Sequence, residues 1–200
     1  MNKKHKIRYY VGIDEVGRGP LAGPVSVGVF CIPVDNLSYI DTATDSKQTT
    51  LKAREDFYKT MLSLRRDGIC SFMVVHKTAK QIDKLGISRC IKDAIATGLA
   101  QLSVDPISTQ IFLDGLLYAP AEYIHQRTII KGDSIEKTIG AASIVAKVTR
   151  DRYMVRMSKT YPDYGFEAHK GYGTETHRKA IKRSGICPLH RAKWVRNILG

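Results

Sequence analysis

The chain has 200 residues, which suits one globular domain with a small appended subdomain. Its hydrophobic fraction of 43% is sufficient for one core, whereas 32 Lys and Arg against 19 Asp and Glu leave a net charge of +13. We find no signal peptide and no apolar run near the roughly 20 residues that span a bilayer, so we expect a cytoplasmic protein without a membrane anchor. The four cysteines form no C-x-x-C pair, which counts against a zinc knuckle or a redox dithiol.

The positive charge is concentrated near the end of the sequence. Residues 147–200 hold thirteen Lys and Arg against four Asp and Glu, so they carry +9 of the total. A shorter basic cluster lies at Lys3, Lys4, Lys6 and Arg8. A concentrated basic segment attracts phosphates more effectively than a dispersed charge does, and it indicates a nucleic-acid partner.

The hydrophobic pattern predicts strands that come first and then alternate with helices. In chain order we expect strands at 7–13 and 24–32, a helix at 51–66 capped by Thr49 or Thr50, a strand at 69–76, a helical turn at 82–85, a helix at 87–102, strands at 110–113 and 127–130, and helices at 137–159 and 174–183. This order is typical of an α/β fold with a mixed sheet.

The long helix at 137–159 is predicted from one apolar stripe with helical spacing. Its members are Ala141, Ile144, Val145, Val148 and Val155. Beyond residue 160 the sequence becomes basic, rich in histidine and punctuated by glycine. We therefore predict a catalytic domain at 1–160 and a C-terminal helical segment at 161–200 that packs on it and contacts the substrate.

Four acidic residues stand where strands end or a helix begins. Asp14 and Glu15 end the first predicted strand, Asp114 ends the fourth, and Asp133 precedes the long helix. Strand ends on one edge of an α/β sheet converge, and oxygen ligands are those that Mg²⁺ prefers. Because side chains alternate along a strand, we expect the chain to turn at Asp14 and Glu15 if both are to serve one site.

Each acid also has a structural explanation. Asp114-Gly115 is a common turn dipeptide. Asp133 with Glu136 fits a capping box, and in isolation the cap is the better explanation for Asp133. Asp14 and Glu15 are harder to explain structurally, because two adjacent acids at a buried strand repel each other unless a cation neutralises them.

The most specific stretch of the chain is the turn that follows the first two acids. Gly17 and Gly19 let the backbone approach a sugar–phosphate closely, and Arg18 between them can hold a phosphate. Glycine and proline also mark ordinary hairpin loops, so the turn gains its meaning from the adjacent acids. The whole run from Gly12 to Pro24 reads G-I-D-E-V-G-R-G-P-L-A-G-P.

This run resembles the signature of ribonuclease HII, and further motifs agree in the same order. They are Asp45-Ser46-Lys47, the segment I-D-K-L-G-I from Ile82, Asp114-Gly115, Lys131-Gly132-Asp133, the segment A-A-S-I-V-A-K-V-T-R-D from Ala141, and H-K-G-Y-G-T from His169, followed by His177 and His190-Arg191. The match spans residues 11–191. Gln48-Thr49 and Ala192-Lys193-Trp194 depart from the usual pattern of that family, at positions that concern duplex contacts or packing.

The resemblance implies an RNase H-like fold and an endonuclease that acts on RNA/DNA hybrids and on duplex DNA with embedded ribonucleotides. It implies cleavage on the 5′ side of the ribonucleotide, with two Mg²⁺ or Mn²⁺ ions held by Asp14, Glu15, Asp114 and Asp133. We expect the enzyme to act as a monomer. The resemblance further implies a set of nucleic-acid contacts, namely Gly17, Arg18, Gly19, Ser46, Lys47, Lys147 and Tyr172.

Several alternatives stay open at this point. Tyr172 also fits a loop tyrosine packed on the fold, and Lys147 fits a solvated helix face equally well. We interpret the three C-terminal histidines as structural or as lining the substrate edge, since a two-metal site supplies its own nucleophile. Two other functions compete, a non-catalytic duplex-binding module and an RNase H-like nuclease that acts on damaged DNA.

Overall fold

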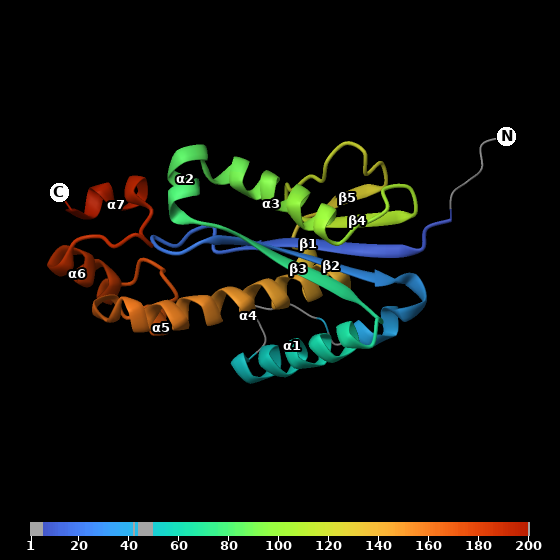
Figure 1. The fold of residues 1–200 in the computed structure, drawn as a ribbon, viewed down its shortest axis with the longest axis horizontal. Helices are drawn as coiled ribbons and strands as arrows, with labels where there is room; N and C mark the ends of the chain where they lie inside the picture. Colours follow the sequence, from blue (N-terminus) through green and yellow to red (C-terminus); the bar gives the residue numbers. More distant parts are fainter. Residues whose placement is uncertain (1–5, 42, 44–49, 200) are drawn as a thin grey trace.

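The computed structural model describes residues 6–41, 43 and 50–199. Five strands form one sheet, and helices cover both of its faces (Figure 1). The strands are β1 Tyr9–Val16, β2 Val25–Pro33, β3 Ser71–Lys77, β4 Thr109–Asp114 and β5 Gln126–Ile129. The helices are α1 Leu51–Arg66, α2 Ala79–Leu85, α3 Ile87–Gln101, α4 Lys137–Thr160, α5 Phe166–His169, α6 Glu175–Ser184 and α7 Ala192–Leu199, with 3-10 turns η1 Val34–Ile40, η2 Gly132–Ser134 and η3 Pro162–Tyr164.

The sheet is mixed, as the sequence predicted, and its strand order is β3-β2-β1-β4-β5. The neighbours β1 and β2 are antiparallel, as are β2 and β3, whereas β4 runs parallel to both β1 and β5. The register between β1 and β4 pairs Ile13 with Leu113. The next residue on each strand is an aspartate, so Asp14 and Asp114 follow the last paired residues of two neighbouring parallel strands.

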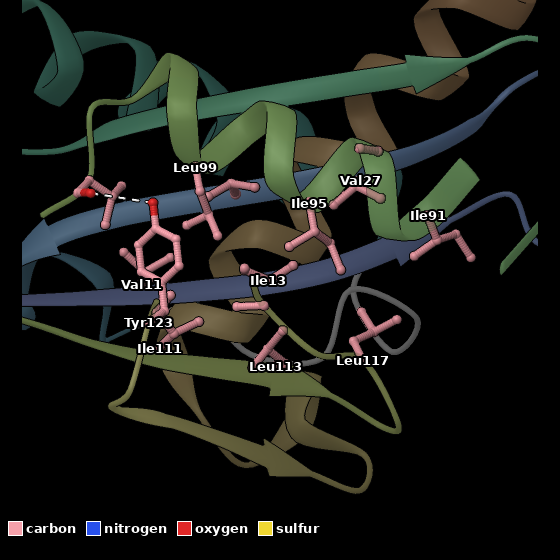
Figure 2. Packing of buried hydrophobic residues seen from close by; sticks show 14 of the residues in the cluster. Val11, Ile13, Val27, Ile91, Ile95, Leu99, Ile111, Leu113, Leu117 and Tyr123 are labelled. Atoms are coloured by element: carbon pink, nitrogen blue, oxygen red, sulfur yellow. Dashed lines mark hydrogen bonds between the residues drawn. The ribbon is translucent and has the colours of Figure 1, made fainter. Parts of the chain in front are cut away.

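The alternation of side chains on β2 divides the core between the two faces of the sheet. Val25, Val27 and Val29 pack with α3, and Figure 2 shows Ile91, Ile95 and Leu99 of that helix above Val11 and Ile13 of β1. On the other face, the side chains of Phe30 and Ile32 belong to a second cluster with the small residues of α4 and with Met61 of α1. Each face buries a continuous apolar layer, which stabilises the sheet between its helices.

The first half of α4 lies directly on the backbone of β1 and β2. A Cβ atom on Gly12 would come within 2.0 Å of the Thr138 carbonyl, and one on Gly28 within 2.3 Å of the Ala142 oxygen. No side chain could occupy either position without displacing the helix. Residues 138–146 of α4 are consequently buried all round, because the sheet covers one side and α1 packs on another.

The structure corrects two predictions about these elements. The chain does not turn at Asp14 and Glu15, since β1 continues to Val16 and the turn begins at Gly17 with φ +84°. Val155 is not part of a buried stripe on α4, because 41% of it is exposed while Met154 beside it is fully buried. The helix α7 was not predicted. The Thr50 side chain caps α1, as one of the two predicted alternatives, by accepting a hydrogen bond from the Ala53 N–H.

Candidate active site

Glu15, Asp114 and Asp133 lie near Asp14, at the carboxyl ends of β1 and β4. Burial raises the pKa of Asp14 to about 8, a hydrogen bond from Ser143 opposes the rise, and the charges of Glu15, Asp114 and Asp133 add to it. Burial also raises the pKa of Glu15, against an ion pair with Arg18 and with a contribution from Asp114. Charged groups from β1, β4 and η2 are therefore close enough to act on one another at this edge of the sheet, although β1 continues through Asp14 and Glu15 without the predicted turn.

Backbone groups orient two of these carboxylates. The Gly132 N–H donates to Asp114 Oδ1 at 2.7 Å, and the Glu15 N–H donates to Asp14 Oδ1 at 2.7 Å. A Cβ atom on Gly132 would lie 2.5 Å from the Ile139 Cδ1, so a side chain at this position would require the Ile139 side chain to move. The chain thereby links the end of β4 to η2 and brings Asp133, which is buried, toward Asp14.

Asp133 does not cap the long helix, so its preferred structural explanation is wrong. The N-cap of α4 is Glu136, whose side chain accepts from the Thr138 N–H at 3.2 Å. The acid three residues after Asp133 is thus itself the cap, and Asp133 lies one turn earlier in η2. This removes the main alternative to a role for Asp133 in the acidic site.

The donor set suits a hard divalent cation, although its carboxylates are not yet arranged around one. Four carboxylates gathered at one strand edge repel one another, and Mg²⁺ or Mn²⁺ with oxygen ligands would relieve that repulsion. Within residues 6–41, 43 and 50–199, no three Asp, Glu, His or Cys side chains adopt the spacing of a complete metal site. Instead, Arg18 Nη1 lies 3.1 Å from Glu15 Oε1.

The glycine-rich turn presents its middle residues to solvent. Gly17 needs its positive φ, and a Cβ atom there would lie 2.2 Å from Arg150 Nε, whereas a Cβ atom on Gly19 would meet no atom within 4 Å. The Arg18 side chain is 58% exposed. A cavity of about 760 Å³ opens beside Glu15, Arg18 and Asp114 and extends to α3. The turn and the acids therefore border one continuous recess.

Two fully buried arginines hold this turn, and the sequence analysis assigned no role to either. Arg191 donates to the carbonyl oxygens of Gly17, Arg18 and Gly23 at 2.6, 2.8 and 3.1 Å. Arg150 donates to those of Pro24 and Lys170 at 2.9 and 3.0 Å. Burial lowers the pKa of Arg191 to about 10, so its guanidinium stays charged at neutral pH. The only signal in the sequence was that both lie in segments resembling the family motifs.

The C-terminal segment is joined to the turn by backbone hydrogen bonds as well. The Leu21 N–H donates to the Gly171 oxygen at 2.9 Å, and the Arg191 N–H donates to the Leu21 oxygen at 2.8 Å. Trp194, one of the residues that depart from the family pattern, stacks on Arg191 with 4.8 Å between the guanidinium carbon and the ring centre. This departure therefore contributes to packing beneath the turn.

The predicted nucleic-acid contacts are placed unequally. Tyr172 is 42% exposed, and the Arg150 guanidinium carbon lies 6.0 Å from its ring centre, so its ring is partly packed and partly open to a ligand. Lys147 is partly buried, and its Nζ lies 3.0 Å from Asp151 Oδ1 in a salt bridge on the surface of α4. The predicted contacts Ser46 and Lys47, together with the departure at Gln48-Thr49, lie outside the described residues.

The three C-terminal histidines form a packed group with Phe166. The rings of His169 and His177 stack with centroids 4.4 Å apart, and His177 Nε2 lies 3.1 Å from His190 Nε2. His177 Nδ1 is 2.9 Å from the Tyr172 oxygen. These contacts position the loop that carries Tyr172, in agreement with a structural interpretation of the histidines.

This group predicts a loss of stability in mild acid. Burial lowers the pKa of His177 from 6.5 to about 4, and the nearby charges of His169 and His190 contribute. Between these two pH values the unfolded chain binds a proton that the folded chain excludes, so the free energy of unfolding should fall by roughly 3 kcal/mol as pH drops from 6.5 to 4. Urea titrations of wild type and His177→Gln at several pH values measure this. An equally steep fall in the variant would contradict the assignment to His177.

Solved structures with a similar fold place the chain among proteins with the RNase H-like fold. The crystal structure of ribonuclease H2 from Pyrococcus horikoshii OT3 superposes with a TM-score of 0.72 at 24% identity, covering 96% of this chain and 97% of that one. A structure of Bst-RNase HIII in complex with Mn²⁺ gives a TM-score of 0.68 at 17% identity, covering 91% and 64%. Both likenesses concern the fold.

Sequence comparison defines the family. The model of ribonuclease HII matches residues 11–197. Ribonuclease HII of Acetivibrio thermocellus is 41% identical over 188 residues, which cover 94% of this chain and 70% of the relative. The chain therefore belongs to the ribonuclease HII family and is an endoribonuclease that cleaves RNA in RNA/DNA hybrids and at embedded ribonucleotides. Among the described helices, none combines the length and apolarity needed to cross a membrane.

Proposed function

We propose that the chain hydrolyses the phosphodiester on the 5′ side of a ribonucleotide, leaving 5′-phosphate and 3′-hydroxyl ends. Asp14, Glu15, Asp114 and Asp133 are the proposed catalytic residues, and the substrates are RNA/DNA hybrids and duplex DNA with embedded ribonucleotides. The observation that carries the proposal is the convergence of these carboxylates on Asp14, which is buried and whose pKa is raised. Repulsive charges at a strand edge are costly to folding unless they serve a ligand.

The four carboxylates would hold two divalent cations, Mg²⁺ or Mn²⁺. Two such ions, when bound, supply an activated water and stabilise the leaving oxygen of an in-line displacement. The chain contributes the negative charge, and it orients the oxygens of Asp114 and Asp14 through the N–H groups of Gly132 and Glu15. The Ser143 hydroxyl donates to Asp14 from α4, so the carboxylate is held from helix and strand together.

Recognition of the ribose would fall to the glycine-rich turn and Tyr172. The 2′-hydroxyl is the local group that distinguishes RNA from DNA, so its reader must approach the sugar closely. Gly19 offers open backbone for this approach, and the partly exposed ring of Tyr172 offers a surface on which a sugar can stack. Arg18 and Lys147 would hold phosphates, and the sequence motif adds Ser46 and Lys47 to this set.

The test is a cleavage assay on three matched duplexes with Mg²⁺, Mn²⁺ or EDTA. The duplexes are an RNA/DNA hybrid, DNA with one ribonucleotide, and DNA alone. We expect metal-dependent cuts in the first two and none in the third, with the 3′ end of the upstream fragment extendable by a polymerase. Binding without any product would indicate a duplex-binding module, and cleavage of the all-DNA duplex would favour an RNase H-like nuclease that acts on damaged DNA.

Replacing Tyr172 tests the proposed recognition of the ribose separately from the proposed metal site. Loss of one stacking partner costs about 1–3 kcal/mol, so Tyr172→Ala should lower the cleavage efficiency at a single ribonucleotide by roughly tenfold to a hundredfold. Tyr172→Phe keeps the ring and should retain most of the activity. Tyr39→Ala is the matched control, because Tyr39 is similarly exposed, at 50% against 42%, but lies in η1. If Tyr172→Ala cleaved as efficiently as wild type, Tyr172 would be better explained as a loop tyrosine that packs on the fold.

A further inference from the structure

A second groove lies away from the acids, on the outer face of α4. It has a volume of about 1010 Å³ and runs between the N-terminal end of α1 and the loop that carries Tyr172. In Figure 1 the helices α1 and α4 lie next to each other, and α4 leads from the sheet to the C-terminal elements. Six of the lining residues are basic, namely Arg54, Lys147, Arg152, Arg156, Lys159 and Lys170.

Three acids also line the groove, but they do not cancel its charge. Asp151 pairs with Lys147 and Glu55 pairs with Arg152, while Glu167 is the third. The lining therefore keeps a net charge of +3. Such an excess along a concave surface favours a polyanion over a neutral or cationic ligand.

The groove is connected to the acidic site along a single helix. Ser143, which donates to Asp14, is followed one turn later by Lys147, and from Lys147 the groove lining continues along α4 to Lys159. At 1.5 Å per residue, Lys147 and Lys159 are about 18 Å apart along α4. A duplex rises about 3.4 Å per base pair, so this length corresponds to roughly five base pairs.

We propose that this groove binds the phosphate backbone of the duplex on the 3′ side of the ribonucleotide, with Arg156 and Lys159 at its outer end. The inference rests on the proposed function. If the cut lies 5′ of the ribonucleotide, the acids contact the strand on the 5′ side of the sugar that stacks on Tyr172. The groove has Tyr172 in its wall and leads away from the acids, so the duplex that enters it is the part downstream of the ribonucleotide.

The experiment measures binding in EDTA, where no turnover occurs, by fluorescence anisotropy over a range of salt concentrations. Three duplexes, each with one ribonucleotide, are compared: one with two long flanks, one with the 3′ flank shortened to about two base pairs, and one with the 5′ flank shortened in the same way. A flank of about two base pairs is too short to reach the outer end of the groove. Wild type should lose affinity about tenfold on shortening the 3′ flank and little on shortening the 5′ flank. Arg156→Glu/Lys159→Glu should bind the long duplex as weakly as the short one, and the slope of log affinity against log salt should fall by about two.

The matched control is Lys59→Glu/Arg66→Glu, which makes the same charge change on α1. Both residues are exposed and neither lines the groove. An equal loss of affinity in this control, or a dependence on the 5′ flank, would overturn the inference. So would groove variants that bind duplexes normally but lose binding of poly-glutamate, since that result would assign the surface to an acidic protein. Cleavage of a single-ribonucleotide duplex by wild type tests the proposed function independently of all these outcomes.

Discussion

Asp14→Asn is expected to lower the cleavage rate on a single-ribonucleotide duplex by at least about a thousandfold, because the proposed metal site, whose contribution would be several kcal/mol, loses its central carboxylate. The amide has nearly the shape of the carboxylate and keeps an oxygen that can accept from Ser143. Asn should not add strain to β1, and it removes both the burial of a charge and the repulsion from neighbouring acids, which together raise the pKa of Asp14. Folding is therefore expected to survive. Initial rates with Mg²⁺ and Mn²⁺, together with thermal unfolding, measure both quantities.

A control and a second readout separate the role of Asp14 from a general effect of charge. Asp56→Asn makes the same change on the exposed face of α1, where Asp56 pairs with Lys59 at 3.5 Å, and should leave the rate unchanged. Mg²⁺ that binds only the folded state should raise the melting temperature of wild type and of this control, but not of Asp14→Asn. Metal-dependent turnover by Asp14→Asn at the wild-type rate would disprove the ligand assignment.

Arg191→Lys is expected to reduce the free energy of unfolding by roughly 3–5 kcal/mol, the range measured for breaking a buried charged network. The guanidinium serves three carbonyl oxygens at once, and a single ammonium cannot reach all of them. The carbonyl oxygens that the ammonium does not reach would lose their donor. Since stabilities are usually 5–15 kcal/mol, this variant should still fold at low temperature.

Activity should fall in the same variant for a geometric reason. Under conditions where Arg191→Lys is folded, as checked by circular dichroism, we expect a higher KM for single-ribonucleotide duplexes because the Gly17–Gly19 backbone is no longer held. Arg183→Lys is the control, since Arg183 is exposed and its Nη2 donates to the Asp163 oxygen at 3.1 Å. If Arg191→Lys had the same midpoint of denaturant unfolding as wild type, the turn would not depend on this hydrogen-bond network.

The sequence predicted those elements best whose signals are local. The bounds of α1 were predicted correctly, because an N-capping threonine precedes it and Gly68 follows it. Asp133 was misinterpreted as a cap because the local motif contains two acids, and only the path of the chain from β4 shows that Glu136 is the one used. Val155 was misplaced because periodicity cannot show where α4 leaves the cover of the sheet.

The acids were identified from motifs and strand ends, but their convergence depends on contacts that periodicity does not encode. The parallel register of β1 and β4 brings Asp14 next to Asp114, and the Gly132 N–H draws the following loop toward them. The roles of Arg150 and Arg191 could not be predicted, since most of their acceptors are backbone carbonyls more than a hundred residues away, such as those of Pro24 and Gly17. The metal ligands and the ribose contacts stay predictions.

The hydrogen bond between Arg191 and Gly17 joins residues separated by 174 positions. A ribosome releases the N-terminal residues first, so the glycine-rich turn emerges long before the guanidinium that holds it. A growing polypeptide would therefore complete its sheet while the backbone proposed to recognise the ribose still lacked support. The enzyme should become competent only after Arg191 has been synthesised and has left the ribosome, and shorter nascent chains should cleave nucleic acid poorly.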